Sequence, residues 1–387
     1  MTSQPPARPG PGAPALSMCP DPVVLDGSSL TIDSVVAVAT GARTVALAAE
    51  ARARMAKARA VVEASLSRAE PVYGLTTGLA ERKRSVLAAP RRRALNRLMV
   101  QSHRVAQGPL APVPVVRAAM TCLANSFAKG FAGVRPALAD IVLAALGEGF
   151  VPAVRSLGSV GEADLGPMAD LAEGLLVHSG FALEENEGLA LLNSNAFSTA
   201  WSALAFAGTA RLMATADVAA ALDLEAFGAN LNALHPIVAE CQPLPGTRAV
   251  LEHLRACLEG SSLWAPGAAR NLQDPLTFRC IPQVHGAGRE ALSYARSVIE
   301  AELNAAQGNP IVVEPEGRVV SVGNFDAVVL AAAVDFLRIA LAPVLLAAAE
   351  RSIKLLQSPL SGLPAGLAAD AAASEDALAE FAVAAQA

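Results

Sequence analysis

Aromatic and charged residues are both scarce in this chain, at 4% and 17% of its 387 residues. Hydrophobic residues nevertheless make up 53%. The apolar surplus is therefore mostly Ala, Leu and Val in Ala-rich runs, and such runs favour helix. The net charge of −5 gives no general positive field, so we expect no nucleic acid partner.

Cysteine and histidine patterns that hold metals or disulfides are also missing. The five cysteines have no C-x-x-C spacing, and the five histidines form no H-E-x-x-H or other paired motif. Zinc sites and disulfide frameworks depend on such spacings. The sequence therefore predicts reduced thiols, no metal site and a cytoplasmic location.

No apolar run is long enough to cross a membrane. The most hydrophobic stretch, Ala327–Ala349, contains Asp335, Arg338 and Pro343, and its longest uncharged run is Ile339–Ala349. A bilayer needs about 20 apolar residues, so we expect no membrane span. Residues 1–17 are rich in Pro and Gly without an apolar core, which predicts a disordered extension rather than a secretory signal.

Helical periodicity dominates the rest of the chain, and the predicted fold class is all-α. Long helices are expected at Thr40–Ala64, Arg117–Leu146, Gly286–Leu303 and Asn324–Leu356. Alternating strand patterns are nearly absent. One short hairpin, Pro310–Val313 with Arg318–Val322, is the exception.

Polar segments interrupt these helices, and functional residues concentrate in such segments. Eight of them, taken in order, resemble the histidine and aromatic amino-acid ammonia-lyase and aminomutase family. They are YGLTTG (73–78), QSHRVAQG (101–108), GSVG with DLGPMADLA (158–172), GLALLNSN (188–195), QDPLTFRCIPQVHGA (273–287), ELNAAQGNPIV (302–312), VGNFDA (322–327) and SGLPAGL (361–367). The resemblance runs from Pro22 to Ala368.

The resemblance implies an ammonia-lyase-like fold with a central bundle of long helices and few short strands. Residues 18–208 would form the active-site region and residues 209–387 the long-helix bundle. Relatives are tetramers whose sites are shared between subunits, so we expect a homotetramer.

The family's electrophile, methylideneimidazolone, forms from an Ala-Ser-Gly triad after Gly-Ser-Val-Gly. Here that stretch is Glu162-Ala163, one residue shorter, and is followed by Asp164. Without the Ser and the Gly we expect no such cofactor, and electrophile-driven ammonia elimination would be lost with it.

Three further departures bear on function. The chain ends at Ala387, soon after Pro364, where the family continues with another helical segment. We therefore expect a site that is less covered, or covered by another subunit. Leu276 replaces the family's tyrosine, and Ser194-Asn195 replaces its Gly-Thr.

Two retained residues match the family's reaction centre, and the resemblance implies a proton carrier at Tyr73 and a proton carrier or carboxylate partner at His103. Tyr73 matches the family's catalytic acid/base, although a tyrosine packed in this loop would also fit the pattern. A phenol acts as a base only where cations or helix N-termini outweigh its desolvation. His103 matches a histidine near the substrate, and a satisfied buried histidine is the alternative.

Other retained residues would bind substrate. Arg279 matches the arginine that clamps a carboxylate, a task that suits a guanidinium; an ion pair with Asp274 is the alternative. The remaining matches could equally satisfy backbone groups or pack in the core; they are the amides Gln273, Asn193, Gln283 and Asn309, and the wall residue Phe325.

Three residues are new relative to the family. Glu162 stands where relatives place the electrophile, and it is either an acid/base group or a plug held by a salt bridge. Asp164 is expected to cap the helix that follows it. His285 replaces an apolar residue and is a second candidate for added chemistry, here assigned to substrate binding.

Two hypotheses from different classes follow, with an ordinary electrophile-dependent ammonia-lyase ranked behind both. In the first, the chain is an enzyme of secondary metabolism that performs acid/base addition–elimination or ring closure on a small carboxylate. Retention of Tyr73, His103 and Arg279 favours it. In the second, the chain is a non-catalytic homologue that binds a ligand or pairs with an active lyase. The lost triad, the change at Leu276 and the short C-terminal part favour this alternative.

Overall fold

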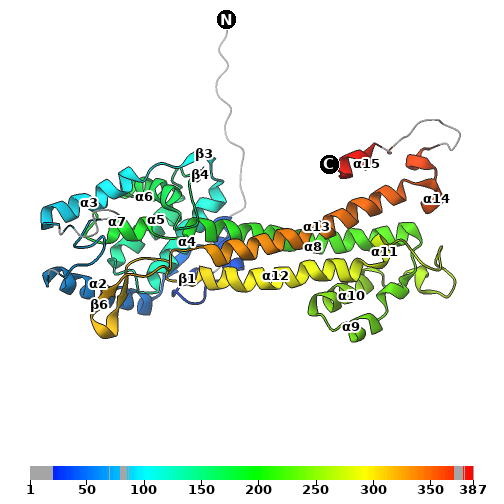
Figure 1. Cartoon of the computed structure of the whole chain (residues 1–387), viewed down its shortest axis with the longest axis horizontal. Coiled ribbons are helices and arrows are strands. Elements are labelled where there is room, and N and C mark those ends of the chain that lie inside the picture. The colour runs from blue at the N-terminus through cyan, green and yellow to red at the C-terminus, as the bar shows by residue number, and fades with distance from the viewer. Residues whose placement is uncertain are drawn as a thin grey trace, which may run out of the picture.

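The computed structural model describes residues 21–68, 70–78, 85, 87–369, 378 and 380–386. The extension predicted at residues 1–17 lies outside this range. Figure 1 shows an elongated molecule in which a compact N-terminal part continues into a rod of long helices. A smaller group of helices forms the far end of the rod, so the two ends of the chain's helical body are widely separated.

Helices supply most of the described elements, and the prediction of an all-α fold is confirmed. They are α1 Ile32–Ala39, α2 Ala49–Ser67, α3 Ala89–Ser102, α4 Val113–Ala128, α5 Pro136–Glu148, α6 Leu165–Ser179, α7 Glu187–Leu192, α8 Ala196–Phe227, α9 Ile237–Cys241, α10 Pro245–Cys257, α11 Leu276–Arg279, α12 Ile281–Leu303, α13 Val328–Leu355, α14 Ser358–Ser361 and α15 Phe381–Gln386.

The strands are short and pair two by two. They are β1 Val23–Leu25, β2 Val45–Leu47, β3 Gln107–Leu110, β4 Arg155–Leu157, β5 Ile311–Val313 and β6 Arg318–Val320. The β5–β6 pair is the predicted hairpin, and its turn ends at Gly317 with a φ of 60°. The other two pairs, β1–β2 (parallel) and β3–β4 (antiparallel), were not predicted.

Two of the helix predictions were wrong in extent. The helix expected from Thr40 begins only at Ala49, because strand β2 occupies the residues before it. The single helix expected over Arg117–Leu146 is two helices, α4 and α5. Gly130 adopts a φ of 85° and Pro136 starts the second helix, so the chain turns between them.

The core of the N-terminal part surrounds α4, which packs against α1, α5 and α8. Twelve of its sixteen residues are buried. The same hydrophobic cluster continues into the first half of α8 and the second half of α12. The long helices α8 and α12 therefore share the core of the N-terminal part, and their packing holds its segments in place.

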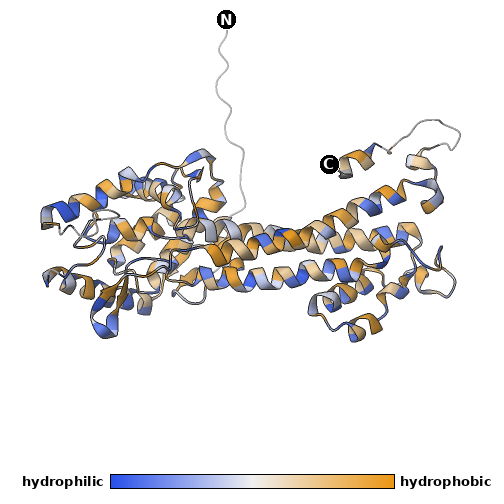
Figure 2. Ribbon diagram, viewed as in Figure 1, coloured by the Kyte–Doolittle hydropathy of each residue, from blue (hydrophilic) through white to orange (hydrophobic). Residues whose placement is uncertain are grey.

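The rod consists of α8, α12 and α13 lying side by side (Figure 1). Figure 2 shows hydrophobic residues along much of these helices. On α13 several large apolar side chains are exposed, including Phe336, Ile339 and Leu346. By length and a mean hydropathy of 2.2, α13 is the one helix in the described residues that could cross a membrane, a test that core helices of soluble proteins also pass.

A second hydrophobic cluster forms the far end of the rod. It joins the end of α8 to α10, and it centres on Phe227 and Phe278, whose rings stack 4.1 Å apart. Phe278 belongs to α11. This cluster fixes the segment that carries Gln273 and Arg279 at the end opposite α3 and α7 (Figure 1).

Candidate active site

The segment that carries Glu162 is held by backbone pairing with the segment that carries Phe325. Glu162 forms an isolated antiparallel bridge with Asp326. The amide of Ala163 donates to the carbonyl of Phe325 at 2.8 Å. Ala163 is buried and adopts a φ of 66°, whereas the Glu162 side chain is exposed. Glu162 and Phe325, both predicted site residues, therefore lie on adjacent backbone segments, and the carboxylate of Glu162 is exposed.

Asn193 and Asn309 join the same region. The amide of Asp164 donates to the carbonyl of Ser194 at 2.9 Å, which brings the end of α7 against the Glu162 segment. The side-chain amide of Asn193 donates to the carbonyl of Asn309 at 2.9 Å, and the Asn309 side chain accepts from the amide of Val322. Both asparagines thus satisfy backbone groups, the alternative considered from the sequence, while positioning the loops around Glu162.

Neither amide nitrogen that follows Glu162 is free. The amides of Ala163 and Asp164 both donate to carbonyls. Building an imidazolone here would require a backbone nitrogen to attack a carbonyl, and a Ser to lose water. This segment contains no Ser-Gly pair and has its nitrogens engaged, so its residues do not fit that cofactor.

Asp164 begins α6, but its side chain makes no capping hydrogen bond, and the capping role expected for it is wrong. Its carboxylate instead accepts from the hydroxyls of Ser159 and Ser198, both at 2.6 Å, and from the amide of Ser198 at 2.7 Å. Burial raises the pKa of Asp164, and these hydrogen bonds offset the desolvation only in part. The carboxylate thereby fastens the Glu162 loop to the start of α8.

His103 terminates α3 on the same side of the molecule. Its Nδ1 lies 2.8 Å from the carbonyl of Met99. Because a carbonyl only accepts, Nδ1 carries a proton and Nε2 is the basic nitrogen of the neutral ring. Three residues later, the backbone of Ala106 lies against both Gly158 and Gly166, which flank the Glu162 loop. His103 is therefore anchored at the end of α3, three residues before a segment that packs against the glycines flanking the Glu162 loop.

Tyr73 lies in a tight loop after α2, half-buried against the N-terminal core. Gly74 follows it with a φ of 69°, a conformation that suits glycine. Neighbouring Val72 and Leu75 pack against Val312 of β5. Apolar contacts thus hold the loop against the hairpin that follows Asn309.

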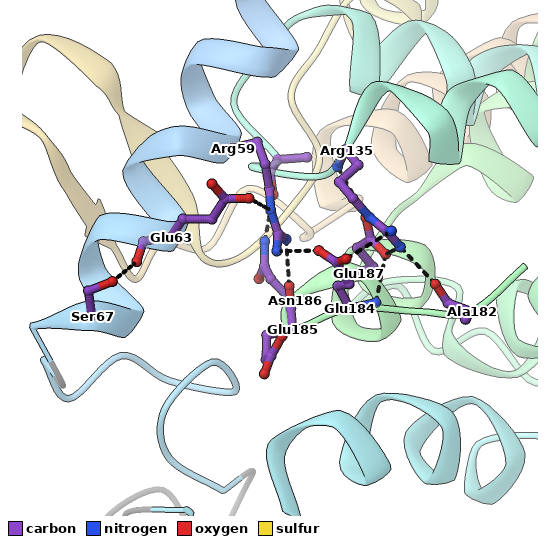
Figure 3. A network of polar contacts seen from close by, with 10 residues as sticks. Arg59, Glu63, Ser67, Arg135, Ala182, Glu184, Glu185, Asn186 and Glu187 are labelled. Atoms are coloured by element: carbon purple, nitrogen blue, oxygen red, sulfur yellow. Dashed lines mark hydrogen bonds and ion pairs between the residues drawn. The ribbon is translucent and has the colours of Figure 1, made fainter. Parts of the chain in front are cut away.

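An ion-pair network holds the approach to α7 (Figure 3). Arg135 contacts the carboxylates of Glu184 and buried Glu187. Arg59, almost fully buried on α2, pairs with Glu184 and donates to the carbonyl of Glu185. These charges are satisfied within the network, so we assign them to fixing α7 and, through it, Asn193.

Arg279 and Gln273 lie elsewhere, at the far end of the rod. They line a cavity of about 390 Å³ together with Asp274 and two asparagines. The Nε atom of Arg279 is buried without a hydrogen-bond partner, whereas Asp274 accepts from the amide of Asn230. The ion pair between Arg279 and Asp274, considered from the sequence, is not formed. One chain therefore does not bring Arg279 to Glu162.

His285 also belongs to the far end and is wholly buried. Its Nδ1 donates to Asp217 at 2.7 Å, and Asp217 also accepts from His253 at 3.0 Å and from Arg289. Although burial alone would raise the pKa of Asp217, hydrogen bonds from His285, Arg289 and His253 hold it below its usual value. The contacts of His285 are thus those of a core residue. No group of metal-binding side chains occurs in the described residues.

A family model, described as aromatic amino acid lyase, matches residues 30–181 and 178–387. The chain belongs to this family. It is 39% identical to the histidine ammonia-lyase of Anaeromyxobacter sp. (strain K), over 89% of this chain and 74% of that protein. The enzyme of the same name from Caldanaerobacter subterraneus is 34% identical, over 88% and 72% of the two chains. A lyase-like enzyme is thus the functional class of the family.

Solved structures of the family share the fold. Ergothionase from Treponema denticola matches with a TM-score of 0.89 at 25% identity, over 95% of this chain and 78% of that one. Tyrosine aminomutase from Streptomyces globisporus matches with a TM-score of 0.88 at 28% identity, over 94% and 77%. The ammonia-lyase-like fold predicted from the motifs is therefore confirmed.

Sequence reasoning missed the cluster of Asp164 with Ser159 and Ser198, and the cluster around Asp217. Ser159 and Asp164 belong to one motif, whereas Ser198 lies outside all eight motifs, so their partnership was hidden. Asp217 lies in an apolar helix of 32 residues. It shares that helix with Asp223 and Glu225, and a carboxylate inside an otherwise apolar run was the available signal.

Proposed function

We propose that this chain is a lyase-like enzyme that works without methylideneimidazolone, by acid/base addition–elimination or ring closure. Its substrate would be a small carboxylate or amino-acid-derived molecule of secondary metabolism. The observation that carries this proposal is the Glu162 segment, whose two following amides are engaged while the carboxylate is exposed beside Phe325. A carboxylate at this position supplies proton transfer in place of an electrophile.

Each retained residue has a role in this reaction. Arg279, with Gln273 beside it, would hold the substrate carboxylate through its planar guanidinium. Tyr73 would move a proton at the carbon next to a carbonyl. His103, with a basic Nε2, or Glu162 would serve as the partner acid or base. A substrate whose C–H is already acidic needs no electrophile for this step.

Assembly is part of the proposal, because Arg279 and Glu162 belong to opposite ends of one elongated chain. A homotetramer, with each site shared between subunits, would bring the two ends of different copies together. The exposed apolar side chains of α13 support such packing. Light scattering at micromolar concentration should give the mass of a tetramer; the mass of a monomer would contradict both statements.

Intact-mass measurement tests the missing cofactor. Methylideneimidazolone formation releases two water molecules, so the measured mass should equal the sequence mass apart from removal of the initiator Met. The chain should also release neither urocanate from histidine nor a cinnamate from phenylalanine or tyrosine. A deficit of two waters in the peptide around Glu162 would refute the proposal.

The alternative, a non-catalytic ligand-binding or partner-subunit homologue, is favoured by exposed Leu276 at the family's tyrosine position. Glu162→Gln separates the two. If Glu162 is catalytic, the substitution lowers turnover and leaves the free energy of unfolding unchanged. If Glu162 only fills the vacated electrophile site, the substitution lowers stability and leaves turnover unchanged. Asp326→Asn, which changes the neighbouring side chain across the bridge, is the matched control.

A further inference from the structure

A cavity of about 460 Å³ lies between the start of α8 and the start of α13. This volume falls in the range of about 300 to 1,000 Å³ that is usual for small-molecule sites. Phe197, Trp201, Leu330 and Val334 supply apolar and aromatic walls, and four serines also line the cavity, namely Ser156, Ser159, Ser198 and Ser202. The cavity thus pairs an apolar surface with a small polar surface.

Two of these serines cover a buried carboxyl group. Ser159 and Ser198 both line the cavity, and both direct their hydroxyl protons to the carboxylate of Asp164. Asp164 is wholly buried, and its hydrogen bonds, from the two hydroxyls and from the amides of Ser198 and Phe197, all come from neutral donors. In the part of the chain described by the structure, no Arg, Lys or His pairs with it.

A buried carboxylate without a cation is costly, because hydrogen bonds replace only part of its hydration. The serine hydroxyls use their protons on Asp164, and the Oγ of Ser159 also accepts from the amide of Gly161 at 3.3 Å. The cavity can therefore offer a ligand only the remaining lone pairs of these two oxygens. The cavity's described lining contains no Lys or Arg, and its one charged member, Asp335, is exposed and already paired with Arg338 at 2.8 Å. The buried carboxylate of Asp164 and the serine oxygens are therefore the features that favour a cation that donates hydrogen bonds.

We propose that this cavity binds an organic ammonium ion with an aromatic or alkyl body. The ammonium group would donate to the hydroxyl oxygens of Ser159 and Ser198, above the carboxylate of Asp164. The body would pack on Phe197 and Trp201, where a ring face also attracts a cation. The inference concerns binding alone, and it holds whether or not the proposed reaction takes place.

Trp201 is a built-in reporter, since the chain has only one other tryptophan, Trp264. In the full-length Trp264→Phe variant, phenethylamine at neutral pH should change Trp201 fluorescence saturably, with a Kd of about 1 mM or lower. Hydrocinnamate, which has a similar body but a negative charge, should bind at least about tenfold more weakly. Equal affinity for the two probes, or no saturable change with phenethylamine, would overturn the proposal.

Two variants test the location. Asp164→Asn keeps the shape but removes the charge, and it should weaken phenethylamine binding at least about tenfold. Ala331→Phe should block the cavity, whereas Ala332→Phe, at the next exposed position of α13 outside the lining, should leave binding unchanged. Unfolding curves and light scattering establish that the variants fold and assemble alike.

The remaining outcome is occupation of the cavity by a second copy of the chain. In that case Ala331→Phe would lower the oligomer mass, and phenethylamine would leave Trp201 unchanged in the assembled wild type. Either result would refute an ammonium site. Because binding is measured without turnover, neither result bears on the catalytic roles of Tyr73 and Glu162.

Discussion

Two buried aspartates hold α8, one near each end of the helix, and their surroundings differ. Asp164, in the N-terminal part, is bonded by two serine hydroxyls and an amide, and burial raises its pKa. Asp217, at the far end, is bonded by two imidazoles and a guanidinium that lower its pKa despite burial. The cationic partners of Asp217 compensate its charge, so this cluster is a structural anchor of the far end. Asp164 has no such cationic partner among the described residues, and it lies beside a cavity and the Glu162 loop.

The largest expected effect distinguishes chemistry from anchoring. Tyr73→Phe removes one oxygen and keeps the ring, so the free energy of unfolding should barely change. Turnover on the true substrate should fall by roughly two to four orders of magnitude, the usual contribution of a positioned acid or base. Steady-state kinetics beside denaturant unfolding would measure both. Unchanged turnover at saturating substrate would remove Tyr73 from the mechanism.

At the far end the expected effect is on stability. Asp217→Ala would leave Arg289 and the buried His285 without their shared partner, and such losses cost about 3–5 kcal/mol. Urea denaturation would measure this loss. Ser202→Ala, on the same helix but away from the ion cluster, is the control. A loss below about 1 kcal/mol would show that the cluster is not an anchor.

The pH dependence of stability should have opposite signs at the two carboxylates. Folded Asp164 binds its proton more tightly than the unfolded chain does. Its contribution to the free energy of unfolding therefore falls as the pH rises from the ordinary pKa of an aspartate through the raised pKa. Folded Asp217 binds its proton less tightly, so its stabilisation is present above the ordinary value and lost as pH falls through the lowered pKa.

Unfolding free energies of wild type, Asp164→Asn and Asp217→Asn across pH would measure this difference. Relative to wild type, Asp164→Asn should gain stability as pH rises through its window. The advantage of wild type over Asp217→Asn should shrink as pH falls through the other. If the stability difference from wild type changes with pH in the same direction for both variants, the two carboxylates do not differ as expected.

The smallest expected effect concerns substrate binding. Arg279→Lys keeps the charge but loses the planar pair of donors, so KM for a carboxylate substrate should rise roughly tenfold while kcat changes little. Arg255→Lys, near the same end but stacked on Trp264, serves as the control. A fall in kcat with unchanged KM would instead give Arg279 a part in the chemical step.

Motif order was enough to predict the family, the all-α class and the β5–β6 hairpin, because these depend on local patterns and residue identity. The extent of the helices was less accessible. The bend between α4 and α5 depends on Gly130 at positive φ, and the 32-residue α8 carries almost no amphipathic signal because different faces of it are buried along its length. Such features follow from tertiary packing rather than periodicity.

The candidate site was predicted in a similarly uneven way. The segments that carry Glu162, Asn193, Asn309 and Phe325 lie together in the fold, while the roles predicted for these residues stay predictions. The partnership of Asp164 with the two serines was not visible, since the local pattern favoured a helix cap. A side chain can leave its own helix for a partner in another element, and only the three-dimensional arrangement decides this.

The distance between the two ends of the rod has a genetic consequence. If the chain forms a homotetramer in which Tyr73 and Arg279 act in one site but come from different copies, a Tyr73→Phe chain and an Arg279→Ala chain each damage every site of their own assembly. Mixed tetramers, formed by co-expression, would contain some sites with both residues intact. Co-expression of the two impaired variants in one cell should therefore restore part of the activity, whereas the double variant expressed alone should stay impaired.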